Sequence, residues 1–361
     1  MGAQTEWLQL RLIFAIAVIA ILGWIFFRRH RLQIRDALLC GGMGMLCLWI
    51  IAYPSIVDRV LNLGRIREFP LGRVVVLLLL AQLFWLVVLF VLRERSNDQV
   101  ERFNRLVSIL SVELERNNGD VSPEKFREIM VVLPAYREEE NVTSVLEKIP
   151  KQVNGYSVGV VVVVDGIEDP TANVVQQRFP GAVVLRQLVR VGSGAALLRG
   201  YRLCASHGVR VVVSMDSDGQ HSPDDLSVLL QPILDGTHDV VIGNRLKGGW
   251  EVESTWRFVG LHIFGFIVRV LMRINAWDCS NTYRAFLLDP VMAIGLEEAQ
   301  YHTLELLFKA HRAGLRIGEV PIRVLARRSG TSKKGNTLYY GYQFFKRLLR
   351  YGLSKKVNGM K

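Results

Sequence analysis

Short apolar runs alternate with helical patterns through the middle of the chain, and this alternation restricts the folds open to it. The runs are rich in valine and isoleucine without polar–apolar alternation, as expected of strands buried on both faces of a sheet. Such strand–helix alternation predicts an α/β domain with a mostly parallel sheet and right-handed crossovers. The expected strands are residues 129–133, 158–164, 182–185, 209–215 and 239–242, and the expected helices are residues 141–148, 170–178, 194–207 and 223–234.

Polar side chains follow four of these strands. Ligands of open α/β sheets bind outside the carboxyl ends of the strands, so these groups are expected on one edge of the sheet. An Asp-x-Asp alone is more often part of a turn than of a site, but four polar groups on one edge favour a site for a metal and a phosphorylated substrate. The groups are Pro134-Ala-Tyr-Arg-Glu138, Asp165-Gly166, Asp216-Ser-Asp-Gly-Gln220 and Gly243-Asn-Arg245.

Asp216, Asp218 and Gln220 are the predicted metal ligands. Two carboxylates and an amide oxygen are hard ligands that suit Mg²⁺ or Mn²⁺. The neighbouring His221 is interpreted as lying beside the metal rather than binding it.

Other common sites are excluded or disfavoured by the sequence. No Gly-x-Gly-x-x-Gly follows the first expected strand and no P-loop is present, which argues against a dinucleotide-binding or P-loop fold. The four cysteines show no metal-binding spacing and are expected to be reduced. A net charge of +12 could indicate nucleic acid. Together with the apolar segments it favours a membrane surface or phosphorylated substrates, and no nucleic-acid partner is expected.

The first quarter of the chain is predicted to be a transmembrane domain, residues 1–95. Three apolar runs, about 12–27, 37–53 and 74–92, approach or reach the length of a membrane span. A cleaved signal peptide is the alternative for the first run, but its basic cluster follows the run instead of preceding it. Arginines after the third run favour a cytoplasmic carboxyl-terminal part. Residues 96–122 are expected to be a juxtamembrane helix and linker.

Two later segments also suggest contact with lipid. Residues 254–275 are apolar with interspersed arginines, and residues 334–361 are aromatic and basic. We expect interfacial helices in the first segment and a basic amphipathic tail in the second, although a core helix is the alternative for residues 254–275.

The order of motifs between residues 129 and 333 resembles the inverting family 2 glycosyltransferases of GT-A fold. Within that family it is most similar to polyprenyl-phosphate sugar transferases of the dolichyl-phosphate mannosyltransferase type. The resemblance implies a GT-A domain over residues 123–333. Together with the three predicted spans and the arginines that follow them, it leads us to expect a multi-pass membrane protein with a cytoplasmic catalytic domain. Besides the four strand-end groups, the matching motifs are Gly192-Ser-Gly-Ala-Ala196, Asp278-Cys-Ser-Asn-Thr-Tyr-Arg284, Glu319-Val-Pro-Ile322 and Arg327-Arg-Ser-Gly-Thr-Ser-Lys333.

The resemblance also implies roles for single residues. A nucleotide-sugar donor, GDP- or UDP-linked, would contact Pro134, Tyr136, Glu138, Asp165 and Asp216. The phosphate of a dolichyl or undecaprenyl phosphate acceptor, or the departing diphosphate, would bind Arg245, Arg327, Ser332 and Lys333. The catalytic set would be Asp218, Arg245 and Asp278, with Asp278 near the sugar.

Two departures from the family pattern leave the donor open. The second-strand motif usually has two aspartates followed by Gly-Ser, but here it is Val164-Asp-Gly-Ile167. Ser193 stands where the helix motif usually has lysine. Both lie where the nucleotide is expected, so the sugar and the nucleotide stay undefined.

Two other functions also stay open. One is an inactive GT-A membrane scaffold, and the other is a transferase that builds a polysaccharide on another lipid acceptor. The Gln-x-x-Arg-Trp motif usual in processive polysaccharide synthases is absent.

Overall fold

A computed structural model describes most of the chain from residue 122 onward. The described residues are 122–249, 251, 255–326, 344–349 and 351, together with 16, 42 and scattered positions between 81 and 107. The chain divides into two compact units, Met1–Val100 and Glu101–Lys361. Each unit is considered by itself.

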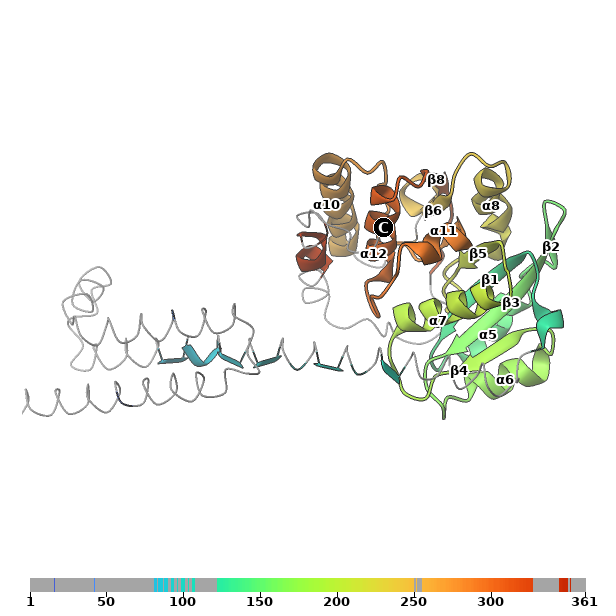
Figure 1. Ribbon diagram of the computed structural model, residues 1–361, viewed down its shortest axis with the longest axis horizontal. Coiled ribbons are helices and arrows are strands. Elements are labelled where there is room, and N and C mark those ends of the chain that lie inside the picture. The colour runs from blue at the N-terminus through green and yellow to red at the C-terminus, as the bar shows by residue number, and fades with distance from the viewer. Residues whose placement is uncertain are drawn as a thin grey trace, which may run out of the picture. The chain divides into compact units, whose positions relative to one another are not determined.

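The second unit is built around a mixed sheet with the strand order β2-β3-β1-β5-β7-β6-β8, in which β4 also pairs with β3 (Figure 1). All five predicted strands form. Strands β3 and β5 flank β1 in parallel, and β4 beside β3 and β8 beside β6 are also parallel. The strands are β1 (Ile129–Ala135), β2 (Gln152–Val153), β3 (Tyr156–Val164), β4 (Val183–Arg186), β5 (Val211–Ser214), β6 (Val240–Asn244), β7 (Arg284–Leu287) and β8 (Ile317–Pro321).

Strand β7 was not predicted, and it determines how the strands are arranged at the edge where β5 and β6 end. It lies between β5 and β6 and runs antiparallel to both. The register places Arg284, its first residue, beside Ser214 at the end of β5 and Ile242 near the end of β6. The segment that leads into β7, residues 278–283, therefore lies at the edge where β5 and β6 end.

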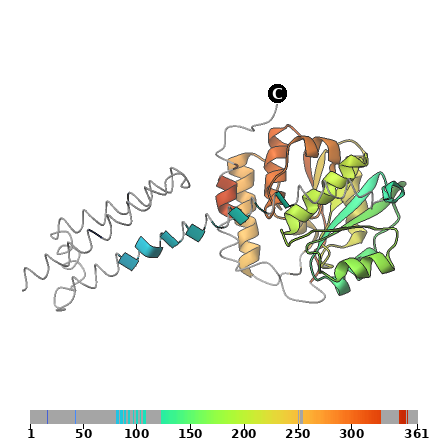
Figure 2. The ribbon, with the colours of Figure 1, turned by 60° about the horizontal axis from the view of Figure 1, so that its bottom comes forward.

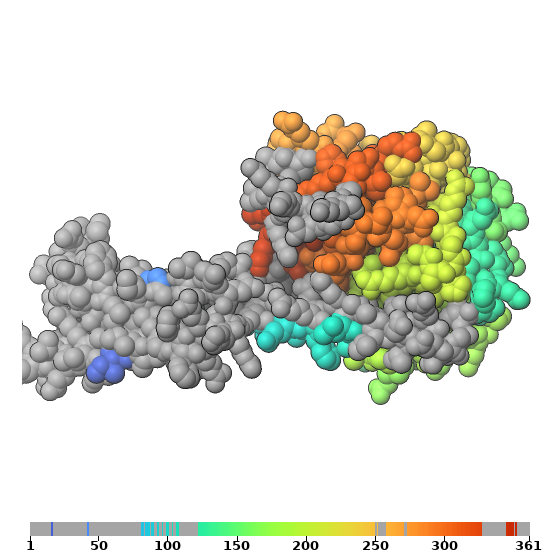
Figure 3. Space-filling view, in the orientation of Figure 1, coloured from blue at the N-terminus to red at the C-terminus, as the bar shows by residue number. Residues whose placement is uncertain are grey.

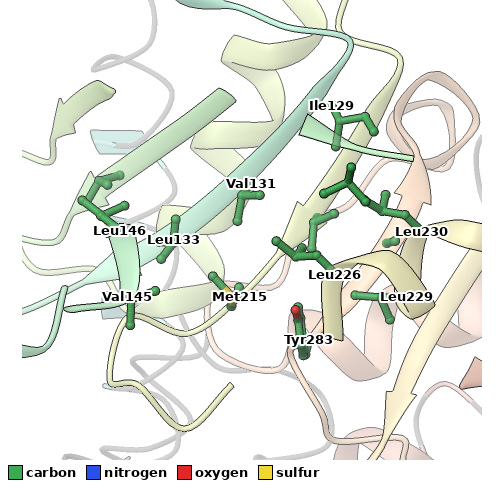
Figure 4. Close-up of a cluster of buried hydrophobic side chains, with 14 of the residues drawn as sticks. Ile129, Val131, Leu133, Val145, Leu146, Met215, Leu226, Leu229, Leu230 and Tyr283 are labelled. Atoms are coloured by element: carbon green, nitrogen blue, oxygen red, sulfur yellow. The ribbon is translucent and has the colours of Figure 1, made fainter. Parts of the chain in front are cut away.

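Helices cover both faces of the sheet, as buried strands require. Successive side chains of a strand point to opposite faces. Ile129, Val131 and Leu133 of β1 thus join one core with the helices α5, α6 and α8 (Figure 4), whereas Met130 and Val132 join a second core with α7, α11 and α12. Figure 3 shows α7 (yellow-green) and the α11–α12 region (orange) on the surface that covers this second face. The helices are α5 (Glu139–Leu146), α6 (Thr171–Arg178), α7 (Ser193–Ser206), α8 (Leu226–Leu234), α11 (Leu288–Ala293) and α12 (His302–Arg312), with the 3-10 turns η3 (Pro123–Lys125) and η4 (Pro223–Asp225).

A third, smaller core forms around α10 (Thr255–Met272), which confirms a helix within the predicted residues 254–275. Helix α10 and the helical residues 344–349 lie side by side (Figures 1 and 2), and the rings of Phe264 and Phe344 are 4.7 Å apart. Phe344 and Leu348 are fully buried there. The described part of the predicted tail therefore packs against the domain with one face. The short helix α9 (Arg245–Gly248) follows β6.

The predicted transmembrane domain is described at only a few positions. The expected spans at residues 12–27 and 37–53 lie outside the described residues except for Ile16 and Gly42. The described positions of the third, between 81 and 92, are helical. Within the part of the chain that the structure describes, no helix is both long and apolar enough to cross a bilayer. The three spans stay predictions.

Candidate active site

The four predicted strand-end groups lie along one edge of the sheet, as the sequence suggested. β4, β3, β1 and β5 are parallel neighbours, so their carboxyl ends meet there. β6 ends at the same edge because β7 is antiparallel to both of its neighbours. The edge therefore brings together Tyr136, Asp165, Asp216 and Arg245, which are up to 109 positions apart in the sequence.

The acidic motif leaves β5 in a tight turn. Met215 is buried, while the side chains of Asp216 and Asp218 are half-buried, which leaves both carboxylates within reach of solvent. Gly219 has a φ of 77°, and the Asp218 carboxylate accepts a hydrogen bond from the backbone N–H of Gln220 at 3.1 Å. A turn closed in this way favours glycine, because residues with a Cβ rarely adopt a positive φ.

The motif is tied to the neighbouring parts of the edge. Ser217 is buried, and its hydroxyl donates to the Pro134 carbonyl at 2.7 Å. The Gln220 amide nitrogen donates to the Leu325 carbonyl at 3.4 Å, and the Leu325 N–H donates to the Gln220 carbonyl at 2.9 Å. In this structure Pro134 therefore anchors the acidic turn through its backbone carbonyl.

These residues fit a divalent metal. The motif supplies two half-exposed carboxylates, and the Gln220 hydrogen bond uses the amide nitrogen, whereas a metal would use the amide oxygen. In the described part of the chain, no three or more His, Cys, Asp or Glu side chains form a group that could hold a metal by themselves. Mg²⁺ is usually bound by one or two carboxylates together with substrate phosphates instead of a complete protein cage. The donor set is of that kind.

The end of β1 carries Tyr136 and Glu138. The guanidinium of Arg190 lies 4.2 Å from the centroid of the Tyr136 ring, a cation–π contact. Glu138 is buried and its carboxylate accepts from the Asn141 amide at 2.6 Å. The backbone of Arg137 is held by Asp169, whose carboxylate accepts its N–H at 2.6 Å.

Asp165 anchors the turn before α7. One carboxylate oxygen accepts from the Val191 N–H at 2.7 Å and the other from the Gly192 N–H at 2.8 Å. Burial raises the pKa of the Asp165 carboxyl, although the two N–H donors and Arg190 oppose the shift. The family resemblance assigned this residue to the nucleotide-sugar donor. Both of its oxygens are occupied here, and that contact with the nucleotide stays a prediction.

Arg245 and Asp278 form a two-point ion pair. The Asp278 carboxylate is fully buried and accepts from Nε of Arg245 at 2.7 Å and from Nη2 at 3.0 Å. The same carboxylate accepts from the Arg245 backbone N–H at 3.1 Å. Both oxygens of this buried carboxylate bind Arg245, and the predicted contact of Asp278 with the sugar stays a prediction. Asp278 orients Arg245, whose side chain is 17% exposed.

Glu319 of β8 holds this pair from behind. Its carboxylate accepts from the backbone N–H groups of Trp277 at 2.7 Å and Asp278 at 2.9 Å. It also accepts from the Asn244 amide at 2.8 Å. Glu319 belongs to one of the motifs that resemble the glycosyltransferase family, Glu319-Val-Pro-Ile322. The sequence did not reveal its role as an anchor, because its partners lie about 40 and 75 residues away.

Arg284 is structural. It is 1% exposed, and its guanidinium donates to the carbonyls of Asn281, Cys279 and Thr303 at 2.6–2.8 Å. Burial lowers its pKa to about 10. The buried carboxylate of Glu305 on α12 has other partners: it accepts the N–H groups of Glu297 and Glu298 and pairs with Lys309 at 2.8 Å. Arg327, Ser332 and Lys333, predicted to bind phosphate, lie outside the described residues.

Sequence comparison identifies the family. The profile of Glycosyl transferase family 2 matches residues 130–295, the stretch that contains the whole strand edge. Polyprenol monophosphomannose synthase of Mycolicibacterium smegmatis is 30% identical over 214 residues, which are 56% of this chain and 80% of that protein. The chain belongs to glycosyl transferase family 2.

Two further proteins are similar to about two thirds of this family 2 glycosyltransferase. UDP-N-acetylglucosamine–dolichyl-phosphate N-acetylglucosaminyltransferase of Methanococcus voltae is 26% identical over 250 residues, 64% of this chain and 98% of that protein. A crystal structure of glucosyl-3-phosphoglycerate synthase from Mycobacterium tuberculosis, with Mn²⁺, UDP-glucose and phosphoglyceric acid, is 24% identical with a TM-score of 0.51. It covers 65% of this chain and 83% of that chain. The likeness shows the fold, which confirms the expected GT-A-like α/β architecture.

Proposed function

We propose that this glycosyltransferase moves a sugar from a GDP- or UDP-linked donor to the phosphate of a polyprenyl phosphate, with Mg²⁺ or Mn²⁺ as cofactor. The names of the relatives from M. smegmatis and M. voltae support a polyprenyl or dolichyl phosphate acceptor. The structure determined with Mn²⁺ and UDP-glucose supports the metal and the nucleotide donor. In this chain, the main supporting observation is that Asp216 and Asp218 share a sheet edge with an arginine held by a buried carboxylate.

The chemistry needs no protein base in this proposal. A phosphate monoester has a second pKa near 6, so an acceptor phosphate is largely dianionic at neutral pH and can attack the anomeric carbon itself. The new phosphate–sugar bond forms as the bond from the sugar to the nucleoside diphosphate breaks, with inversion. The protein contributes alignment of the reactants and neutralisation of charge.

Three groups of residues divide this work. Asp216, Asp218 and Gln220 hold the metal, which when bound supplies positive charge to the leaving diphosphate. Arg245 binds phosphate oxygens with the part of its guanidinium that Asp278 leaves exposed, since arginine matches phosphate in a fixed fork geometry. Arg327, Ser332 and Lys333 complete the phosphate site in this proposal. Tyr136, Glu138 and Asp165 line the donor side.

We place the domain against a cytoplasmic membrane surface. Helix α10 exposes an apolar stripe of Val259, Ile263, Phe266 and Val270, each 42–57% exposed, and the neighbouring helix exposes Phe345 and Leu349. A stripe at this spacing lies on one side of a helix. Basic residues, such as Arg269 and Lys346, occur on the same two helices. An apolar helix face with nearby cations suits an anionic lipid surface. The acceptor itself is a lipid.

The test is a transfer assay with two matched acceptors. Membranes that contain the full-length chain receive labelled GDP- and UDP-sugars, Mg²⁺ or Mn²⁺, and either a polyprenyl phosphate or the corresponding polyprenol. We expect acid-labile labelled lipid with the phosphate and none with the polyprenol, which lacks the nucleophile. A polymeric product would favour the polysaccharide synthase. The absence of transfer from every donor would favour the inactive scaffold.

A further inference from the structure

A buried histidine directly follows the acidic motif, and both of its ring nitrogens are engaged. His221 is 4% exposed. Its Nδ1 lies 3.1 Å from the backbone nitrogen of Asp216, and its Nε2 lies 3.0 Å from Oδ1 of Asn281. The ring stacks on Tyr283 with 4.9 Å between centroids and 20° between planes. Because both nitrogens are used within the protein, His221 is not itself a metal ligand in this arrangement.

The partners assign the tautomer of the ring. A backbone N–H can only donate, so Nδ1 must accept from Asp216. The proton of the neutral imidazole is then on Nε2, which donates to the amide oxygen of Asn281. The amide orientation agrees, because Asn281 Oδ1 also accepts from the Tyr283 N–H at 3.2 Å and its Nδ2 donates to the Gly243 carbonyl at 2.6 Å.

These contacts connect the two halves of the site. Gly243 lies two residues before Arg245 at the end of β6, and Asp216 lies two residues beyond the end of β5. The hydrogen bonds run without interruption from the Asp216 backbone through His221 and Asn281 to Gly243. Strand β7 separates β5 from β6 in the sheet, so no backbone ladder joins the two strand ends directly.

We propose that His221 is a positioning residue for the diphosphate site. It holds the Asp216 backbone in the conformation that presents the acidic pair to a metal. Asn281, which is itself bound to the Gly243 carbonyl, contacts the other side of the ring. The inference rests on the proposed function, because it takes Asp216 and Asp218 as ligands of the donor's metal. Groups that orient the ligands of a metal commonly change its affinity by 10- to 100-fold when they are replaced.

Three substitutions separate the contacts of His221. His221→Asn keeps an acceptor near the position of Nδ1 and loses the reach to Asn281. His221→Gln keeps a donor near the position of Nε2 and loses the acceptor for Asp216. His221→Phe keeps a ring against Tyr283 and loses both hydrogen bonds. Tyr283→Phe is the matched control, because it removes only the hydrogen bond from the Tyr283 hydroxyl to the Ser222 carbonyl, 2.9 Å long, and keeps the stacked ring.

The measurement is the dissociation constant of Mn²⁺, followed by electron paramagnetic resonance of the free ion. Purified full-length chain is used with saturating UDP or GDP, each tried separately, and thermal melts show which variants fold. We expect the constant to rise roughly 10- to 100-fold for His221→Gln and His221→Phe, and to stay near the wild-type value for His221→Asn and Tyr283→Phe. In the transfer assay, the Gln and Phe variants should require more Mn²⁺ and recover kcat when Mn²⁺ is saturating.

The possible failures can be told apart. If wild-type protein does not bind Mn²⁺ with either nucleotide, the metal assignment of the proposed function is wrong, and this inference with it. If wild-type binds and the Gln and Phe variants bind equally tightly, only the role of His221 is wrong. The same holds if Tyr283→Phe weakens binding as much as His221→Phe does. Should His221→Phe not fold, the contrast between the Asn and Gln variants decides.

Discussion

Arg245 and Asp278 meet through two side-chain hydrogen bonds, Nε to Oδ2 at 2.7 Å and Nη2 to Oδ1 at 3.0 Å. The carboxylate is completely buried, whereas 17% of the arginine side chain is exposed. The residue that reaches solvent at the sheet edge is therefore the arginine, and the aspartate fixes its direction. Glu319 in turn fixes the backbone of Asp278.

Asp278→Asn tests whether Asp278 holds Arg245 in its active orientation. The amide keeps an acceptor but loses the charge and the two-point geometry, so Arg245 is no longer held in one orientation. We expect the free energy of unfolding to fall by about 2 kcal/mol, as for a lost hydrogen bond between charged groups, and kcat to fall on the order of 100-fold. Arg245→Lys keeps the charge without the fork and should show a similar loss of kcat. Asp289→Asn, at an exposed position of α11, is the control. Normal activity of Asp278→Asn in the transfer assay would refute the role.

Gly194→Ala tests the close approach of α7 to the segment after α11. A Cβ at this position would lie 2.5 Å from the Ala299 carbonyl oxygen and 2.8 Å from its carbonyl carbon. Backbone atoms cannot move aside as a flexible side chain can, so the substitution should cost about 1–3 kcal/mol of stability. Denaturant unfolding measures it.

Gly260→Ala is the matched control for that substitution. Gly260 lies within α10, and a Cβ there would meet nothing within 4 Å. It should be neutral or stabilising by up to about 1 kcal/mol, because alanine has the higher helix propensity. Equal stability changes for the two variants would contradict the close packing of α7 against Ala299.

Phe266→Glu tests the lipid-facing role of α10. Phe266 is 57% exposed on the apolar stripe, so the change should leave the fold intact and disturb only the contact with the bilayer. We expect weaker transfer to a long-chain polyprenyl phosphate in membranes, and unchanged transfer to a short, water-soluble isoprenyl phosphate. Val228→Glu is the control, since Val228 is 45% exposed on α8. Equal losses with both acceptors would show that the substitution damages the site itself.

The buried cysteines should be unreactive at mildly alkaline pH. Burial raises the pKa of both Cys204 and Cys279 from 9.0 to about 12, and the thiolate is the reactive form. The folded chain binds these protons more tightly, so the stability they contribute is full below pH 9 and falls as pH rises from 9 to 12. At pH 9, iodoacetamide should modify both residues in urea and neither in the native protein, as followed by peptide mass spectrometry. Native alkylation at the unfolded rate would contradict their burial.

The sequence predicted β1, β3, β4, β5 and β6 because these strands are apolar, mostly valine-rich runs of the kind that a sheet covered on both faces buries. It did not predict β8, which runs parallel to β6. Strand β7 escaped prediction for a physical reason. Arg284-Ala-Phe-Leu287 is short and not β-branched, and it is a strand only because β5 and β6 supply hydrogen-bond partners on both sides.

The candidate site, like the sheet, could be predicted from the sequence only in part. The kinds of residue at the strand ends could be predicted, because polar side chains that follow the carboxyl ends of parallel strands meet at one edge of the sheet. Their pairings could not. The sequence does not reveal that Asp278 forms an ion pair with Arg245, or that Asp165 accepts hydrogen bonds from the backbone of Val191 and Gly192. Each of these contacts joins segments that are 26 or more positions apart. His221 was underestimated for the same reason, since its second partner is 60 residues away.

The most direct test compares two aspartates in one assay of lipid-linked sugar formation. Asp218→Asn removes a charge from the acidic motif, while Asp224→Asn removes one from an exposed position in the turn η4 six residues later. With a polyprenyl phosphate acceptor and saturating Mg²⁺ or Mn²⁺, the account predicts that EDTA and Asp218→Asn each abolish transfer and that Asp224→Asn retains it. Transfer that persists in EDTA, or at the wild-type rate in Asp218→Asn, would contradict the metal-assisted mechanism at this sheet edge.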